Sequence, residues 1–211
     1  MANEFERLAA GVRRFQERVF PVRRAFFARL AKRQSPEILF ITCADSRIVP
    51  ALITMTKPGE LFVERNPGNL VPPYVNACVG ESASVEYAVA ELGVDHVVVC
   101  GHTDCGAVKG LLAPDKVGAK LPAVGRWLAH GAEAIARLPP ETELPDAQAR
   151  LRRLTELNVI VQLEHLRTHP SVAARLARKE IQLHGWVYDI GAGRVDALDA
   201  SSGLFAPWPP G

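Results

Sequence analysis

Two short polar segments each follow an apolar, β-rich run, and together they constrain the fold more than any other feature of the chain. Cys43-Ala-Asp-Ser-Arg47 follows the run 38–42, and His102-Thr-Asp-Cys105 follows the run 97–100. Short apolar runs bounded by polar turns are typical of buried strands. Because ligands gather at the carboxyl ends of strands in an open α/β sheet, we expect the two segments to meet at one edge of such a sheet.

Strand-like and helix-like segments alternate along the chain. Strands are expected over 37–43, 60–65, 95–100 and 158–161, and helices over 82–92, 106–112, 121–138, 146–157 and 171–179. A hairpin of 181–190 and 194–198 is expected to close the fold, followed by a loose tail from Ala206. The alternation predicts an α/β fold with a mostly parallel central β-sheet flanked by helices.

An amphipathic helix is expected near the N-terminus. Apolar side chains recur there at spacings of three and four residues: Phe5, Leu8, Val12, Phe15 and Val19. The segment 1–33 carries nine Lys/Arg against three Asp/Glu, a charge of +6. We expect one domain over 1–211, with 1–33 as a helical arm and 34–211 as the α/β core. The arm can present a solvated basic face, pack on its own core, or reach an acidic partner surface such as a second copy of the chain.

Composition excludes several classes of protein. The net charge of +2 predicts no general affinity for nucleic acid, and no apolar run approaches the roughly 18 residues of a membrane helix. No apolar signal-peptide core follows Met1, and the acidic Glu4, Glu6 and Glu17 are atypical of a transit peptide. Four cysteines in 211 residues do not make a disulfide framework. We therefore expect a cytoplasmic chain whose thiols stay reduced and free to bind metal.

Cys43, His102 and Cys105 form a candidate zinc set. Thiolate and imidazole donors suit zinc, and three protein ligands leave the fourth position open, as in a catalytic rather than a structural zinc site. Asp45 has two roles open to it. It can be a fourth ligand that closes the site, or it can pair with Arg47 and leave that position to water, because a guanidinium keeps a neighbouring carboxylate ionised and oriented.

The remaining cysteines and histidines are expected to have structural roles. Cys100 lies inside an apolar run, and Cys78 is expected to be a buried or idle thiol. His165 and His169 are four residues apart on an expected helix, but Leu166 stands where a His-Glu-x-x-His protease carries its glutamate. The zinc deaminase signature is absent from the sequence as well.

Four segments taken together resemble the β-class carbonic anhydrases, in particular their plant and bacterial branch. They are Cys43-Ala-Asp-Ser-Arg47, Arg65-Asn-Pro-Gly-Asn-Leu-Val-Pro-Pro73, Ser84-Val-Glu-Tyr-Ala88 and Cys100-Gly-His-Thr-Asp-Cys-Gly-Ala107. The resemblance runs in order from Ser35 to Leu112 and continues more weakly beyond. It implies reversible hydration of carbon dioxide to bicarbonate and a proton by zinc-bound hydroxide. One zinc per chain would then be held by Cys43, His102 and Cys105.

The resemblance also implies roles for the surrounding side chains. Asp45 and Arg47 would form the catalytic pair. Substrate would be bound by Gln34, Phe62, Tyr87 and Gly106, the first three reaching the zinc from the neighbouring subunit. The site would then require a homodimer, which can pair further into a dimer of dimers. Two alternatives stay open: a carbon disulfide or carbonyl sulfide hydrolase on the same scaffold, and a non-catalytic zinc-binding or sensing protein.

Two departures from the family pattern bear on the pocket and its regulation. Pro67 stands where the family usually has a small or branched apolar residue, and it can narrow or stiffen the pocket. Bicarbonate-regulated members carry Trp and Gly where this chain has Phe40 and Thr42, although Arg65 and Tyr188 match the rest of that regulatory site. We therefore predict no regulatory bicarbonate site and a fourth zinc position that is open at neutral pH.

Overall fold

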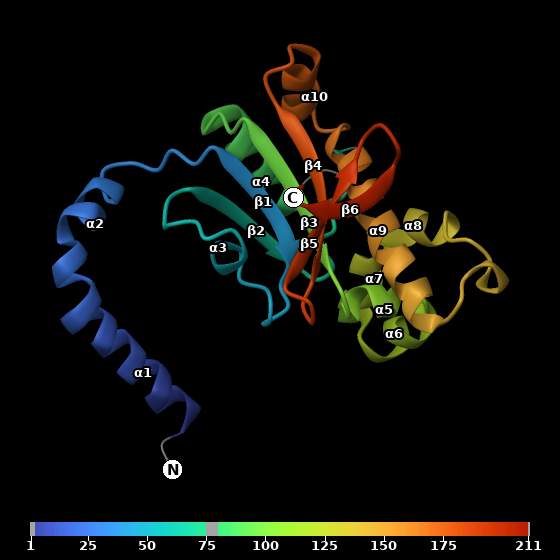
Figure 1. Cartoon of the computed structure of the whole chain (residues 1–211), viewed down its shortest axis with the longest axis horizontal. Coiled ribbons are helices and arrows are strands. Elements are labelled where there is room, and N and C mark those ends of the chain that lie inside the picture. Colours follow the sequence, from blue (N-terminus) through green and yellow to red (C-terminus); the bar gives the residue numbers. More distant parts are fainter. Residues whose placement is uncertain (1–2, 75–79, 211) are drawn as a thin grey trace. The chain divides into compact units, whose positions relative to one another are not determined.

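The computed structural model describes residues 3–74 and 80–210 of the chain (Figure 1). These residues fall into two compact units, Met1–Ser35 and Pro36–Gly211, each of which is described by itself. Cys78, expected to be a buried or idle thiol, lies outside the described residues. Among the described helices, none combines the length and the apolar character needed to cross a membrane.

The first unit is a helical arm. It contains α1 (Glu4–Arg14), a π-helical turn (Phe15–Val19), a 3-10 turn (Pro21–Arg23) and α2 (Arg24–Leu30). A capping box starts α1: Asn3 Oδ1 accepts from the Glu6 N–H at 2.9 Å, and the Glu6 carboxylate accepts from the Asn3 N–H at 2.9 Å. The predicted helix is therefore confirmed. Its apolar side is not covered within the described residues, since Phe5 and Leu8 are 76% and 64% exposed.

The second unit is built around a six-stranded sheet in the order β2-β1-β3-β4-β5-β6. The strands are β1 (Ile38–Cys43), β2 (Leu61–Asn66), β3 (His96–His102), β4 (Gln182–Asp189), β5 (Arg194–Asp199) and β6 (Leu204–Trp208). The first four strands are parallel to one another, and β4, β5 and β6 pair antiparallel. The predicted α/β class, the mostly parallel sheet and the hairpin of β4 and β5 are confirmed.

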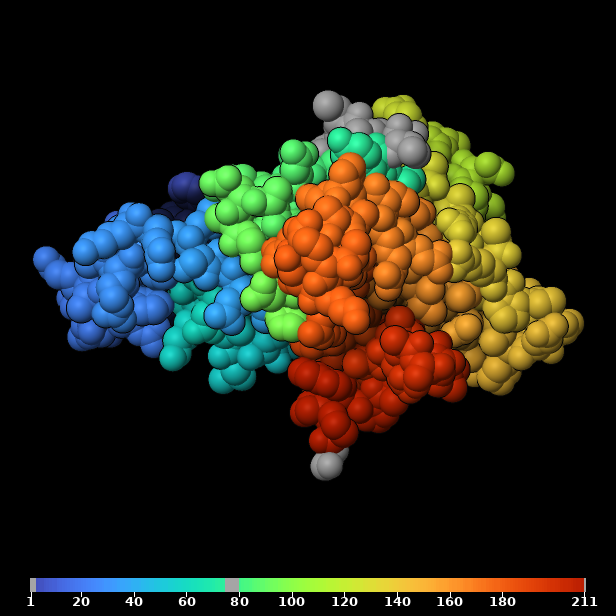
Figure 2. All heavy atoms as spheres, turned by 90° about the horizontal axis from the view of Figure 1, so that it is seen from above, coloured from blue at the N-terminus to red at the C-terminus, as the bar shows by residue number. Residues whose placement is uncertain are grey.

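Helices flank the sheet, and those of the segment 106–166 gather on one side of it (Figure 1). They are α3 (Pro50–Ile53), α4 (Gly80–Glu86), α5 (Gly106–Leu111), α6 (Pro114–Lys120), α7 (Pro122–Leu128), α8 (Ala132–Ala136), α9 (Ala147–Leu166) and α10 (Pro170–Ala177). The long helix α9 packs on β3 and β4 and contacts α5 and α8. Figure 2 shows α10 on the surface beside the segment 80–91, which it contacts at the turn Tyr87–Glu91.

Two sequence expectations for this unit are wrong. The segment 158–161 is not a strand but part of α9. This helix is buried on most of its sides, so its apolar residues lack a one-sided helical period and the run Val159-Ile-Val161 imitates a strand. The tail is not loose, because Leu204–Trp208 pairs with β5 as the outermost strand. Pro207 is tolerated at this edge because a ladder N–H is not needed on the open side.

The core explains why the site segments follow apolar runs. Leu39, Ile41, Val97 and Val99 belong to one buried cluster, and the alternating Phe40, Val98 and Cys100 belong to another on the opposite face. Because β1 and β3 are covered on both faces, their sequences are continuously apolar rather than alternating. The two strands are neighbours in parallel register, with Thr42 opposite Cys100, so their carboxyl ends lie side by side.

Candidate metal centre

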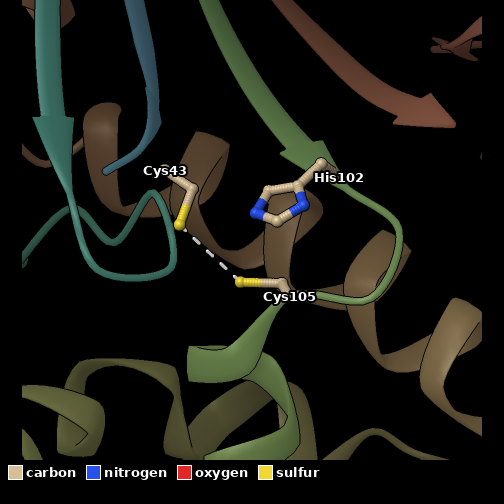
Figure 3. A group of neighbouring side chains, drawn as sticks. All are labelled: Cys43, His102 and Cys105. Atoms are coloured by element: carbon tan, nitrogen blue, oxygen red, sulfur yellow. Dashed lines mark hydrogen bonds between the residues drawn. The ribbon is translucent and has the colours of Figure 1, made fainter. Parts of the chain in front are cut away.

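Three ligand-type side chains meet at the carboxyl end of the sheet. Cys43 is the last residue of β1, His102 is the last residue of β3, and Cys105 directly precedes α5. Their ligating atoms all lie within 4.8 Å of one another, and all three residues are buried. Figure 3 shows the two sulfur atoms facing each other, 3.8 Å apart, beside the imidazole ring. The prediction that these three residues converge is confirmed.

The donor set fits a zinc ion. His102 Nδ1 lies 2.9 Å from the Thr103 carbonyl oxygen, which can only accept, so Nδ1 carries the proton. His102 Nε2 is then an unprotonated acceptor that is buried and has no hydrogen-bond partner among the described residues. An unpaired buried acceptor beside two thiols is costly to desolvate, and a metal ion satisfies it. A ligating histidine fixed by a hydrogen bond from its other nitrogen is common in zinc sites.

The two thiols are in contact, and each shifts the pKa of the other. The Cys105 S–H lowers the pKa of Cys43 to about 4 by donating to its sulfur, and the Gly68 N–H helps in the same direction while burial opposes both. The pKa of Cys105 is raised, first because its proton is held by the Cys43 sulfur and second because the group is buried. The contact favours the thiolate form of Cys43, which is the form in which cysteine binds a metal ion.

Asp45 and Arg47 form a two-pronged ion pair next to these ligands. Arg47 Nε donates to Asp45 Oδ1 at 2.9 Å, and Arg47 NH2 donates to Asp45 Oδ2 at 2.8 Å. These bonds, with a third from the Arg47 backbone N–H, hold the pKa of the Asp45 carboxyl well below its usual range. Asp45 Oδ2 lies 3.9 Å from His102 Nε2. An ionised carboxylate therefore stands beside the candidate metal position.

Three further residues, to which the sequence interpretation gave no role beside Asp45 and Arg47, hold this pair in place. Arg47 NH1 also donates to Asp104 Oδ2 at 3.3 Å, and Lys109 contacts the other Asp104 oxygen. Arg65 donates to the carbonyl oxygens of Cys43 and Asp45, at 3.0 and 2.7 Å, and so fixes the loop after β1. Asp104 has a positive φ of 61°, which Asp tolerates better than most residues. An acidic residue in the turn between the ligands His102 and Cys105 is the sequence feature that could have identified Asp104 as part of the site.

Of the residues assigned to substrate, Phe62 and Tyr87 make no described contact with this site, whereas Gly106 directly follows the ligand Cys105. Phe62 and Tyr87 pack together with ring centroids 6.0 Å apart, and no described hydrogen bond or ring contact links either of them to the three ligands. Gln34 is exposed and belongs to the arm unit. Gly106 begins α5, and a Cβ placed on it would meet no atom within 4 Å.

Among the described residues, Cys100, His165 and His169 have the structural roles that were expected. Burial raises the pKa of Cys100 to about 12, so this thiol stays protonated in the core. His165 Nδ1 lies 2.8 Å from the Val71 carbonyl oxygen and His169 Nε2 lies 3.0 Å from the Pro72 carbonyl oxygen. Both rings donate to these carbonyls, and they fasten the loop after β2 to α9 and α10.

Comparison with known proteins gives consistent matches. A family model described as carbonic anhydrase matches residues 38–195, which include all three candidate ligands. A carbonic anhydrase of Pseudomonas aeruginosa is 53% identical over 195 residues, covering 92% of this chain and 88% of that protein. The solved β-carbonic anhydrase CcaA has a TM-score of 0.95 at 38% identity and covers 100% of this chain and 94% of its own. Tetrameric β-carbonic anhydrases from the filamentous ascomycete Sordaria macrospora give a TM-score of 0.84 at 32% identity, over 97% of this chain and 100% of theirs.

Proposed function

Because this chain belongs to the β-class carbonic anhydrase family, we propose that Asp45 and Arg47 are the catalytic pair with which it hydrates carbon dioxide. The chain is a zinc-dependent carbonic anhydrase, which converts carbon dioxide and water reversibly to bicarbonate and a proton. One observation carries this conclusion from the geometry. Cys43, His102 and Cys105 present ligating atoms within 4.8 Å of one another, with the acceptor nitrogen of His102 buried and unpaired.

Zinc held by Cys43, His102 and Cys105 would act as a Lewis acid and would make a nucleophile derived from water available at neutral pH. Asp45 accepts a hydrogen bond from this nucleophile and so aims its lone pair at the carbon of carbon dioxide. Arg47 keeps Asp45 ionised and oriented. The two-pronged pairing of these side chains supports this division of roles, since it leaves Asp45 no freedom to rotate.

The fourth metal position is open at neutral pH in this proposal. Asp45 is engaged by Arg47 through both of its oxygens, which supports a pairing role rather than a ligand role. The side chains of Phe40 and Thr42, which replace the Trp and Gly of regulated relatives, make their contacts within the core. Phe40 packs edge-on against Trp186, and Thr42 Oγ1 donates to the Cys100 carbonyl oxygen at 2.8 Å. We therefore propose that no regulatory bicarbonate closes the site.

The substrate pocket is completed by a second copy of the chain. Phe62 and the 46% exposed Tyr87 form a ring pair on and beside β2, the outermost strand on its side of the sheet. An aromatic pair there can reach a neighbouring subunit, where it holds uncharged carbon dioxide close to the nucleophile. Gln34 then donates to a substrate oxygen as charge develops. The uncovered apolar side of α1 supports an arm that braces this dimer.

The assembly and location follow from the same argument. A homodimer is the smallest active unit, and the tetrameric relatives from Sordaria macrospora support further pairing into a dimer of dimers. A cytoplasmic location is supported by Cys43, Cys100 and Cys105, which form no disulfide among the described residues. The domain organisation proposed is an arm over 1–33 and an α/β core over 34–211.

Carbon dioxide hydration measured by stopped flow tests the proposal. The rate is followed at about pH 7 and about pH 8.5, which bracket the pKa of zinc-bound water, on protein whose zinc has been counted. Fast turnover at both values is expected. Turnover only at the higher value would mean that Asp45 closes the metal position at neutral pH. Carbon disulfide and carbonyl sulfide serve as comparison substrates, and faster turnover of either would contradict the assignment to carbon dioxide.

A further inference from the structure

A backbone N–H group faces one of the metal-ligating sulfurs. The Gly68 N–H donates to Cys43 Sγ at 3.4 Å, within the loop that follows β2. Gly68 is buried and has a φ of +84°, a conformation that favours glycine. A Cβ placed on it would lie 3.0 Å from the Ala107 Cβ. The loop thus lies tightly against α5, with its amide directed at the sulfur.

The peptide unit that contains the Gly68 N–H is held at its carbonyl end by Trp127. The indole Nε1–H of Trp127, on α7, donates to the Pro67 carbonyl oxygen at 2.8 Å. The Pro67 carbonyl and the Gly68 N–H belong to one planar peptide unit and point in opposite directions when it is trans. A donor that fixes the carbonyl therefore also sets the direction of the N–H toward Cys43.

The next peptide is held by two fully buried amides of α9. Asn158 Nδ2 donates to the Gly68 carbonyl oxygen at 3.0 Å, and Gln162 Nε2 donates to Asn158 Oδ1 at 3.0 Å. Gln162 Oε1 in turn accepts from the Val71 N–H at 2.8 Å. Both side chains are 0% exposed, so they face no competition from water. Asn158 thus holds the peptide that follows Gly68, and Trp127 holds the peptide that precedes it.

We propose that Trp127 is a positioning residue for the metal centre, acting through the Pro67–Gly68 peptide on the sulfur of Cys43. A thiolate that accepts a hydrogen bond donates less charge to its metal ion, so the metal remains a stronger Lewis acid. This matters in a site with two thiolates, because both of them put negative charge on the metal. The inference rests on zinc binding by Cys43 and does not depend on the proposed roles of Asp45 and Arg47.

The variant Trp127→Phe tests the proposal, because it keeps an aromatic ring and removes the N–H donor. The matched control is Trp208→Phe, the same change at a half-exposed residue of β6 that stacks on Trp186. Both variants are loaded with cobalt(II), whose sulfur-to-metal charge-transfer band reports how strongly the thiolates donate. Trp127→Phe is expected to move this band to longer wavelength, and Trp208→Phe is expected to leave it in place.

Activity of the zinc-loaded variants provides a second readout. In Trp127→Phe the pH midpoint of the rate should move upward, with a loss of about tenfold at pH 7, the low end for a group that supports a metal ligand. The rate should recover well above the midpoint. A merely structural role would lower thermal stability and leave both the band and the midpoint where they are in Trp208→Phe, and that outcome would overturn the proposal.

A measurement on the unaltered protein keeps the proposal testable even where Trp127→Phe does not fold. With cadmium-113 in the site, the Gly68 amide proton should show a scalar coupling to the metal through the Cys43 sulfur. Absence of that coupling in the loaded protein would remove the hydrogen bond and the inference with it. Because neither the coupling nor the cobalt band needs turnover, an inactive enzyme would count against the catalytic pair and not against Trp127.

Discussion

Asp45 and Arg47, two residues apart at the end of β1, are joined by parallel bonds of 2.9 and 2.8 Å in a fork-to-fork ion pair. The pair lies beside His102, whose Nε2 is 3.9 Å from Asp45 Oδ2. A guanidinium presents its donors in a fixed planar fork, so this geometry orients the carboxylate as well as keeping it charged. The arrangement separates the binding of metal from the positioning of the nucleophile, and the two can be tested separately.

Asp45→Asn should keep zinc and lose most of the hydration activity. The amide is nearly isosteric but cannot accept a hydrogen bond at both of its ends, and a group that handles a proton in the transition state contributes about 10²- to 10⁴-fold. We expect kcat to fall by at least about 10²-fold in stopped flow with zinc still near one per chain. Asp104→Asn is the matched control, since Asp104 also pairs with Arg47 but is more exposed. An equal loss in Asp104→Asn would contradict the special role of Asp45.

Replacing one cysteine at a time should distinguish a metal-binding cysteine from a cysteine of the core. Cys105→Ser should abolish stoichiometric zinc binding, because a hydroxyl replaces a thiolate in a three-ligand site. Cys100→Ser, within β3, should retain one zinc per chain, since Cys100 is a core thiol kept protonated by burial. Zinc content by elemental analysis distinguishes the two. Retention of zinc by Cys105→Ser would contradict the ligand assignment.

Removal of zinc should also lower the stability of the unaltered protein. A ligand that binds only the folded state at about 1,000 times its Kd stabilises it by about 4 kcal/mol. We therefore expect chelated protein to unfold at a lower temperature than the zinc-loaded protein, in scans made at equal protein concentration. Equal midpoints with and without zinc would show that the ion does not stabilise this fold.

The convergence of the three ligands could be predicted because parallel strands bring their carboxyl ends to one edge. Cys43 and His102 are separated by β2, most of β3 and two helical connections, yet each follows an apolar run, and this pattern suffices to place both. Asp45 and Arg47 could be recognised because they lie within four residues of Cys43. The site residues that lie close to Cys43 in the sequence could therefore be predicted.

The residues that support the site could not be predicted, because their partners are distant in the sequence. Trp127 meets the Pro67 carbonyl across sixty residues, and Asn158 meets the Gly68 carbonyl across ninety. No periodicity links such pairs. The segment 158–161 was also expected to be a strand, so the amides of α9 were assigned to the wrong kind of element. A helix buried on most of its sides removes the amphipathic signal on which that distinction depends.

Buried His169 should make the fold less stable below neutral pH. Burial lowers the pKa of its imidazole, outweighing the opposing bond to the Pro72 carbonyl, and a repulsion from His165 adds to the effect. The unfolded chain therefore binds a proton near pH 6.5 that the folded chain does not, so stability is present above that pH and is lost as the pH falls through it. Urea midpoints of metal-free protein from pH 8 to pH 5.5 measure this. His169→Gln should flatten the slope, and an unchanged slope would assign the titration to other groups.

Gly101→Ala should disturb the metal site through packing alone. Gly101 directly precedes His102, and a Cβ placed on it would lie 3.0 Å from Val159 Cγ2 and 3.1 Å from Thr155 Cγ2, both on α9. Since these are branched side chains of a buried helix, β3 and α9 must separate slightly, and overpacking of this kind costs about 1–3 kcal/mol. Movement of the end of β3 shifts His102, so zinc affinity should fall together with stability.

Gly118→Ala is the matched control for Gly101→Ala, because the same methyl group on α6 would meet no atom within 4 Å. Replacing a helical glycine by alanine in open space should stabilise the fold by about 0.5–1 kcal/mol. The two variants should therefore change the free energy of unfolding in opposite directions, and only Gly101→Ala should weaken zinc binding in competition with a chelator. If Gly101→Ala lost stability but held zinc as tightly as the unaltered protein, the end of β3 would be shown to adjust independently of α9.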